Sequence, residues 1–308
     1  MSTPPADGGD GAATVRWRLR VAYDGAGFRG FAAQEGLPTV AGALAAALGR
    51  VVRSEVSLTC AGRTDAGVHA LGQVVHVDVP AERSAALEPA ALVRSLNSQL
   101  APSIVVQSAG VAPAGFDARH SATARRYRYL VVNAPVPDPL LAGITWHVAD
   151  PLDVRAMAGA ADVLLGEHDF RAFCRRVPGT GPDDPIPRRV TDVRWTRLDG
   201  RSTGARSAGT SRPAADSSRP ATGGGDGPGQ SAPQLVPAVG ELLAFEIEAN
   251  AFCHQMVRSL VGTLVEVGRG RRRPADMLEI LRSADRSRAG QPAPPQGLTL
   301  MTVRYGGG

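Results

Sequence analysis

The 308-residue chain contains no lysine, so arginine supplies all 34 of its basic side chains apart from histidine. Its cysteines are Cys60, Cys174 and Cys253, which are widely separated and odd in number. This pattern argues against a disulfide framework or a zinc cluster and is typical of the reducing cytoplasm. No apolar run approaches the roughly 20 residues that a helix needs to span a bilayer. We therefore expect a cytoplasmic protein without membrane contact.

Two stretches lack the apolar residues of a packed core. Residues 1–14 are rich in Gly, Ala, Pro and Asp and lack the basic start and apolar centre of a signal peptide. Residues 200–238 are rich in Ser, Gly, Pro, Ala, Thr and Arg. Such compositions cannot bury enough apolar surface to order themselves. We expect a disordered tail at 1–14 and a disordered insertion at 200–238.

The charge balance is compatible with a nucleic-acid partner. The net charge is +5, and arginine pairs bidentately with phosphate and stacks on bases. A genomic preference for arginine would give the same composition, so charge alone does not decide the partner.

The alternation of apolar and polar residues predicts the same order of elements twice. In the first half, strands are expected at 15–23, 55–60, 73–79 and 104–111, with helices at 40–52 and 89–100. In the second half, strands are expected at 126–132, 190–198, 242–249 and 298–305, with helices at 151–166, 252–267 and 274–284. Apart from one extra helix, each half has the β-α-β-β-α-β order of a ferredoxin-like unit. We therefore predict an α+β fold of two ferredoxin-like halves, residues 15–112 and 113–308, whose antiparallel sheets flank a central cleft.

The stretch 61–70 concentrates reactive side chains in a short space. It holds one carboxylate, one guanidinium, one hydroxyl and one imidazole, together with two glycines that allow tight turns. Asp65 is the one residue there that could act as a nucleophile through a carboxylate. An ordinary turn, in which the aspartate caps backbone N–H groups, would explain the spacing equally well.

Residues 62–70, Gly-Arg-Thr-Asp-Ala-Gly-Val-His-Ala, are followed by Gly-Gln-Val at 72–74. This run resembles the active-site motif of the tRNA pseudouridine synthase A (TruA) family, and further matching blocks extend from about Val15 to Tyr305. The resemblance implies that Asp65 is the catalytic nucleophile. It also implies that Arg63 fills the base stack when the target base is extruded.

The activity implied by this resemblance is the isomerisation of uridine to pseudouridine at positions 38, 39 and 40 of the tRNA anticodon stem-loop. The conversion involves no redox change and no group transfer, so no cofactor and no metal is implied. The sequence accordingly carries no dinucleotide or P-loop fingerprint. The family also implies tRNA as the partner and a homodimer as the assembly.

Three further blocks carry candidate site residues. Residues 125–129 combine arginines with tyrosines, which indicates either RNA contact or a strand with a buried Tyr face and a solvated Arg face. The resemblance assigns the active-site tyrosine to Tyr127. In the apolar helix expected at 252–267, Arg258 would be partly buried, and it needs an anionic partner unless it extends its charged end to solvent. The family implies that this partner is Asp65, and that Leu298 lines the uracil pocket, although Leu298 also suits a core strand.

Two other functions fit the same residues. One is an RNA-binding protein that uses this fold without catalysis. The intact Asp65 motif argues against this alternative. The other is an N-glycoside hydrolase that uses Asp65 but releases the free base. Detection of released uracil would distinguish hydrolysis from isomerisation.

Overall fold

The computed structural model describes residues 13–175, 181, 184–198 and 240–306. The first half of these residues forms β1 (Thr14–Tyr23), α1 (Val40–Val52), β2 (Leu58–Cys60), β3 (His69–Pro80), α2 (Ala81–Ser84), α3 (Pro89–Leu100) and β4 (Ile104–Val111). The second half forms β5 (Ala122–Asn133), β6 (Trp146–Val148), α4 (Val154–Asp162), β7 (Gly166–Asp169), η1 (Arg171–Phe173), β8 (Pro187–Arg197), β9 (Glu241–Ala249), α5 (Met256–Gly268), α6 (Asp276–Ser283), η2 (Arg286–Arg288), η3 (Pro295–Gly297) and β10 (Leu298–Tyr305).

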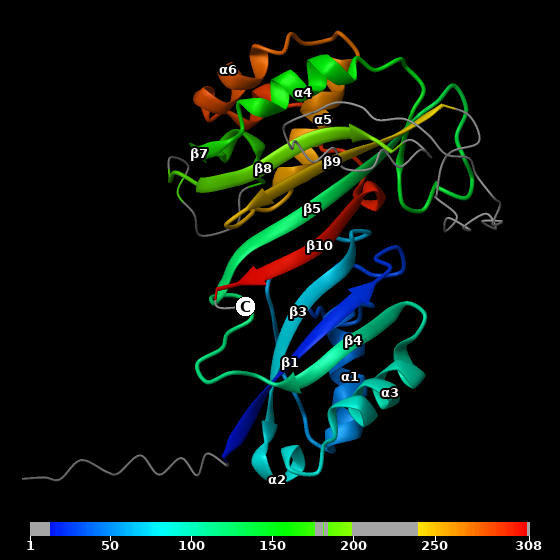
Figure 1. The fold of residues 1–308 in the computed structure, drawn as a ribbon, viewed down its shortest axis with the longest axis vertical. Helices are drawn as coiled ribbons and strands as arrows, with labels where there is room; N and C mark the ends of the chain where they lie inside the picture. The colour runs from blue at the N-terminus through cyan, green and yellow to red at the C-terminus, as the bar shows by residue number, and fades with distance from the viewer. Residues whose placement is uncertain (1–12, 176–180, 182–183, 199–239, 307–308) are drawn as a thin grey trace, which may run out of the picture.

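Within the described residues, the strands form one mixed, mostly antiparallel sheet in the order β4-β1-β3-β10-β5-β9-β8-β7 (Figure 1). In addition, β2 pairs with β3 and β6 pairs with β5. The α+β class is therefore as predicted, but the two sheets expected from the sequence are joined into one. The junction is a short parallel pairing in which Thr299 lies opposite His69 and Leu300 lies opposite Ala70.

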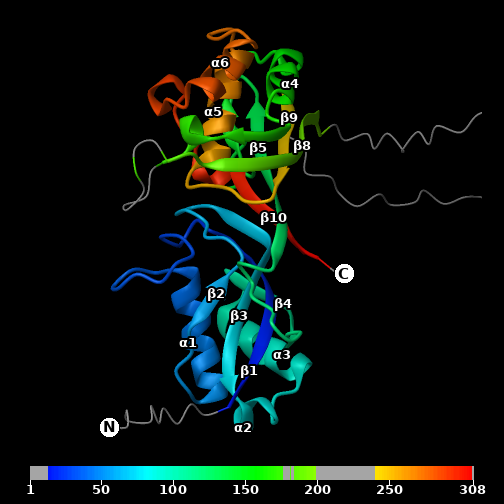
Figure 2. The ribbon, with the colours of Figure 1, turned by 90° about the vertical axis from the view of Figure 1, so that its left-hand side faces the viewer.

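A glycine permits this junction. A Cβ atom at Gly72 in β3 would lie only 2.3 Å from the carbonyl oxygen of Met301 in β10, so any other residue would force the two strands apart. The close approach of β3 and β10 is what brings the two halves of the chain together. Figure 2 shows α1, α2 and α3 with the lower half of the molecule and α4, α5 and α6 with the upper half.

The amphipathic pattern accounts for the helices of the first half. Thr39 caps α1 by accepting the Gly42 N–H at 3.2 Å, as predicted, and the stripe formed by Val40, Leu44 and Leu48 is buried. Helix α3 has the predicted bounds, with its proline in the first turn. Both helices contribute to a core that continues from the first half into the second.

Three predicted helix starts were wrong. Helix α6 begins at Asp276 rather than at residue 274. Helix α4 begins at Val154 and is capped by Asp153, not by the Asp150-Pro151 pair. Helix α5 begins at Met256 rather than at residue 252, because Gln255 adopts a left-handed backbone conformation with φ of 64°. Residues 252–255 therefore form a loop, and this loop contributes to the site described below.

The predicted tail at 1–14 and insertion at 200–238 fall mostly outside the described residues. Residues 13 and 14 are described, and Thr14 already pairs with Pro80 at the start of β1. Both remain predictions for the rest of their length.

Candidate active site

The loop between β2 and β3 holds Asp65 in a fixed position against β1. Thr64 shares a hydrogen bond of 2.8 Å with the buried hydroxyl of Tyr23, and the Thr64 carbonyl accepts the Phe31 N–H at 3.1 Å. The fully buried Gln73 donates to the Gly62 carbonyl at 2.8 Å and to the Tyr23 hydroxyl at 3.3 Å. These bonds satisfy buried polar groups on both sides of the loop, so its backbone is rigid where it presents Asp65.

The Asp65 carboxylate is contacted on both of its oxygens. Arg258 donates from Nη1 to Oδ2 at 3.2 Å, and the Nε2 atom of His254 lies 3.3 Å from Oδ1. The Arg258 side chain is also anchored, because its Nε donates to the Ala293 carbonyl at 2.7 Å. With 23% of its side chain exposed, Asp65 is paired with Arg258 yet still reachable from solvent. The ion pair expected between Arg258 and Asp65 is present.

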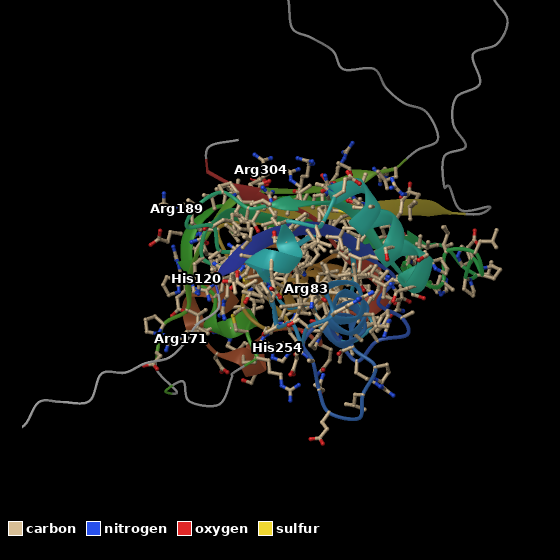
Figure 3. All side chains as sticks on the ribbon, turned by 90° about the horizontal axis from the view of Figure 1, so that it is seen from below. Arg83, His120, Arg171, Arg189, His254 and Arg304 are labelled. Atoms are coloured by element: carbon tan, nitrogen blue, oxygen red, sulfur yellow. A yellow bond between two sulfur atoms is a disulfide. The ribbon has the colours of Figure 1, made fainter. Side chains whose placement is uncertain are left out.

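Sequence reasoning gave His254 no role beside Asp65. His254 falls within the helix expected at 252–267, but it lies in the loop before α5. It reaches Asp65 from this loop, and Figure 3 shows it at the surface of the molecule.

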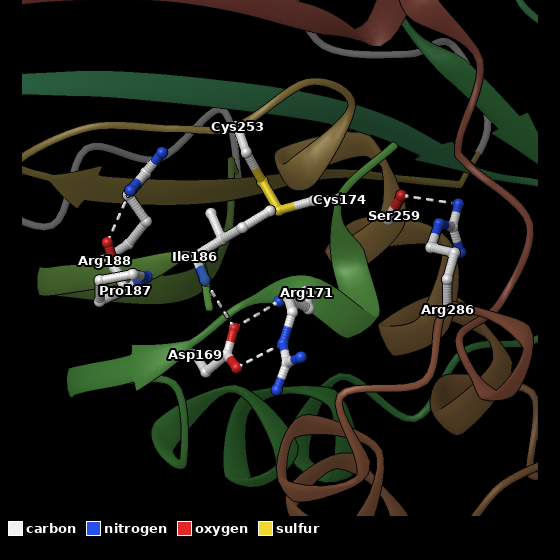
Figure 4. The surroundings of a disulfide bond; sticks show 9 residues. All are labelled: Asp169, Arg171, Cys174, Ile186, Pro187, Arg188, Cys253, Ser259 and Arg286. Carbon is white, nitrogen blue, oxygen red and sulfur yellow. Dashed lines mark hydrogen bonds and ion pairs between the residues drawn. A yellow bond between two sulfur atoms is a disulfide. The ribbon is translucent and has the colours of Figure 1, made fainter. Parts of the chain in front are cut away.

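The loop that carries His254 is tied to the rest of the second half by a disulfide between Cys174 and Cys253 (Figure 4). The prediction that the cysteines form no disulfide was therefore wrong for this pair. Spacing could not show it, since the two cysteines are 79 residues apart and meet through the fold. The neighbouring Arg175 N–H also donates to the His254 carbonyl at 2.9 Å. Cys60 is a free thiol, whose pKa is raised to about 11 by burial.

Tyr127 lies in β5 beside the Asp65 loop and is 7% exposed. Its hydroxyl is 4.0 Å from the place where a Cβ on Gly62 would stand, and its ring packs edge-on against Phe252 with centroids 5.0 Å apart. Burial, together with the nearby Tyr23 and Asp65, raises the pKa of the Tyr127 hydroxyl above its ordinary value. The hydroxyl is therefore protonated at neutral pH and can act as a donor.

The structure buries Leu298 and leaves Arg63 exposed. Leu298 is 6% exposed at the start of β10 and lies opposite Tyr129. Just before it, Pro295 contacts the Asp65 loop, since a Cβ on Gly67 would be 3.0 Å from its ring. Among the described residues, no hydrogen bond or ion pair occupies the Arg63 guanidinium.

Arg125 has a structural role that was not predicted from the sequence. It is 9% exposed, and its two terminal nitrogens donate to four backbone carbonyls, at distances of 2.7–3.0 Å. These carbonyls belong to Ala61, Arg119, Ala122 and Asn250. Burial lowers the pKa of Arg125 from its ordinary value. Arg125 thus connects the loop of Asp65 to the loop of His254. Ala61 lies four residues before Asp65, and Asn250 lies four residues before His254.

Arg126 and Arg128, which were expected to face RNA phosphates, have carboxylate partners. Arg126 lies 2.9 Å from Glu248 and 2.9 Å from Asp192, and Arg128 lies 2.6 Å from Glu246. Because carboxylates already occupy these guanidiniums, the structure does not favour phosphate contact on this face.

A pocket of about 520 Å³ opens next to the loop of His254. It is lined by Cys174, Arg175, Gln255, Arg286, Ser287, Ala289, Gly290 and Gln291, with no carboxylate among them. Arg286 donates to the Ser259 hydroxyl at 3.0 Å (Figure 4). The described part of the chain holds no cluster of three His, Cys, Asp or Glu side chains suited to a metal ion. No helix in that part combines the length and apolar character that a membrane crossing requires.

Comparison with known proteins identifies the family. The family model described as tRNA pseudouridine synthase matches residues 160–306. The tRNA pseudouridine synthase A of Frankia casuarinae is 42% identical over 294 residues, covering 94% of this chain and 89% of the relative. The enzymes of that name from Paracidovorax citrulli and Brevibacillus brevis are 40% and 37% identical, each over 94% of this chain and over 94% and 99% of their own length. At 37–42% identity over 94% of its length, this chain belongs to the tRNA pseudouridine synthase A family.

Proposed function

We propose that this protein converts uridine to pseudouridine at positions 38, 39 and 40 of the tRNA anticodon stem-loop, with Asp65 as the nucleophile. The observation that supports this most is the Asp65 carboxylate, which is partly exposed and is contacted by Arg258 and His254 on separate oxygens. The Arg258 guanidinium pairs with a carboxylate, and the carboxylate is the form that can attack carbon. A turn-capping aspartate would need neither of these contacts.

In this reaction the glycosidic bond from C1′ to N1 breaks, the uracil turns, and C5 forms a bond to C1′. The proton on C5 is lost and N1 gains a proton, so no oxidant and no second substrate is consumed. Asp65 attacks either C1′, which expels the uracil, or C6 of the base, and both routes need the same ionised oxygen. When the carboxylate leaves, Arg258 stabilises its returning charge.

The other predicted site residues are assigned by their surroundings. The target base must leave the stem, at a cost of a few kcal/mol. Arg63 is exposed and unpaired within the described structure, so it is free to occupy the vacated stack. Tyr127, which lies beside the Asp65 loop, and Leu298 are both buried, and they would form the wall against which the uracil turns. The Tyr127 hydroxyl, being protonated, would donate a proton or a hydrogen bond.

The two halves are proposed to be ferredoxin-like units, residues 15–112 and 113–308. The strand orders β4-β1-β3-β2 and β10-β5-β9-β8 support this, because in chain order each is the fourth, first, third and second strand of a β-α-β-β-α-β unit. We also propose a homodimer that acts in the cytoplasm without a cofactor. These statements follow from family membership and the reaction.

Tritium release from tRNA labelled at C5 of uridine tests the function directly, followed by mapping of the modified positions. Isomerisation releases the C5 tritium and leaves the tRNA intact. Release of free uracil would identify an N-glycoside hydrolase, and tRNA binding with neither product would identify a non-catalytic RNA-binding protein. Modification outside positions 38–40 would contradict the proposed specificity.

A further inference from the structure

The Asp65 carboxylate would rotate about its Cβ–Cγ bond if a single donor held it. Arg258 occupies Oδ2, and the remaining oxygen, Oδ1, lies 3.3 Å from Nε2 of His254. A contact on each oxygen, with Arg258 at Oδ2 and His254 at Oδ1, restricts the plane of the carboxylate and the direction of the lone pairs that would attack the substrate. Small errors in that direction reduce the rate of a positioned reaction strongly.

We propose that His254 is a positioning residue for Asp65, which orients the carboxylate for attack without touching the substrate. This inference rests on the proposed role of Asp65 as the nucleophile. It adds a second donor to the ion pair with Arg258, and this donor comes from a different structural element, the loop that precedes α5.

The backbone of His254 is fixed well enough to serve this purpose. Its carbonyl accepts the Arg175 N–H at 2.9 Å, and the preceding Cys253 is bonded to Cys174. The following Gln255 has a left-handed backbone, with φ of 64°, which ends the loop sharply at the first residue of α5. The loop therefore has an anchor at the residue before His254, at His254 itself and at the residue after it.

The side chain of His254 is much more exposed than the side chain of Arg258, the other residue that contacts the Asp65 carboxylate. It is 37% exposed, whereas the Arg258 side chain is 14% exposed and donates to the Ala293 carbonyl as well. Replacing Arg258 would leave a buried gap and an unpaired carbonyl. Replacing His254 removes one donor to Asp65 and little packing, so its contribution can be measured without disturbing the fold.

The test compares His254→Leu with His254→Gln, in single-turnover and steady-state assays on tRNA. The leucine side chain has no donor, whereas the glutamine amide places an N–H group close to where Nε2 of the histidine stood. His254→Leu should lower kcat by about ten-fold, about 1.4 kcal/mol in the barrier. KM for tRNA should stay within two-fold. His254→Gln should restore the rate to within about three-fold of the parent.

His120→Leu is the matched control, because His120 is also exposed and Figure 3 shows it apart from His254. Its kcat should equal that of the parent. An equal loss of kcat in both His254 variants would overturn the inference, since the glutamine retains a donor. A rise in KM at unchanged kcat would overturn it too, because it would place His254 on the tRNA instead.

Asp65→Asn is assayed beside these variants to separate the two proposals. If Asp65→Asn is inactive and His254→Leu keeps full kcat, the positioning role fails and the proposed function stands. If Asp65→Asn remains active, the nucleophile assignment fails and the positioning role fails with it. Melting temperatures of all variants should lie within about 2 °C of the parent, because each replaced side chain is partly exposed.

Discussion

At the scale of single residues, Arg125 shows how a buried guanidinium can be satisfied without a carboxylate. Four backbone carbonyls accept its hydrogen bonds, and they come from segments that lie far apart in the chain. The sequence did indicate that Arg125 would be buried. Tyr127 and Tyr129 were expected on the buried face of their strand, and a period of two residues places Arg125 on that same face. Its role was not predicted because its acceptors are backbone carbonyls, and the residue types in a sequence do not show which backbone carbonyls will accept a hydrogen bond.

Arg125→Met is expected to lower the free energy of unfolding by roughly 3 kcal/mol, because it leaves buried carbonyls unpaired. It should also lower kcat, since Arg125 links the loops of Asp65 and His254. Urea denaturation and the tritium assay measure the two effects. Arg20→Met is the control, since Arg20 is exposed on β1 and should change stability by less than about 0.5 kcal/mol. Equal stability in the two variants would show that the four hydrogen bonds are replaced by water at no cost.

At the scale of elements, periodicity predicted most of the strands and fewer of the helix starts. The strands Ile104–Val111 and Leu298–Tyr305 and the helix Pro89–Leu100 have the bounds expected from the sequence. The start of α5 could not be predicted, because the run from Phe252 is apolar enough for a helix. Its first four residues are instead held by contacts with Cys174, Arg175 and Asp65, which lie elsewhere in the chain. Tertiary contacts override local propensity at this point.

The disulfide beside α5 is expected to be measurable as a change in the number of free thiols. The chain has three cysteines, so the denatured, unreduced protein should titrate with one thiol, Cys60, and the reduced protein with three. Reduction should also increase amide hydrogen exchange in the loop at 252–255, because one of its anchors is lost. Protein purified without reductant and alkylated at once provides the comparison. Three thiols in that sample would mean that the cysteines are reduced as isolated.

At the scale of the whole molecule, the arrangement of charge is more informative than the net charge of +5. The arginines expected to bind phosphate, Arg126 and Arg128, are paired with carboxylates of β8 and β9. By contrast, Arg175 is exposed, and the pocket that it lines with Arg286 contains no carboxylate. Sequence periodicity could place arginines on a strand face, but it could not show which of them had partners across the sheet.

This difference predicts how tRNA binding responds to salt. Arg175→Ala should reduce the slope of log K against log salt by roughly 0.7 to 0.9, the value for one lost phosphate contact. Arg126→Ala should leave the slope unchanged, because its charge is already neutralised within the protein. Filter binding of one tRNA at several salt concentrations measures both slopes. The opposite ranking would show that the β5 face binds the tRNA after all.

The central claim, that Asp65 is the nucleophile, is tested most directly by the rate of C5 tritium release from tRNA by Asp65→Asn protein. Asparagine keeps the shape of the side chain and caps a turn about as well as aspartate, so the fold and tRNA binding should persist. The amide cannot readily form the covalent intermediate, so tritium release should fall below detection. Turnover within a few-fold of the parent enzyme would show that Asp65 is a structural residue and would contradict the account.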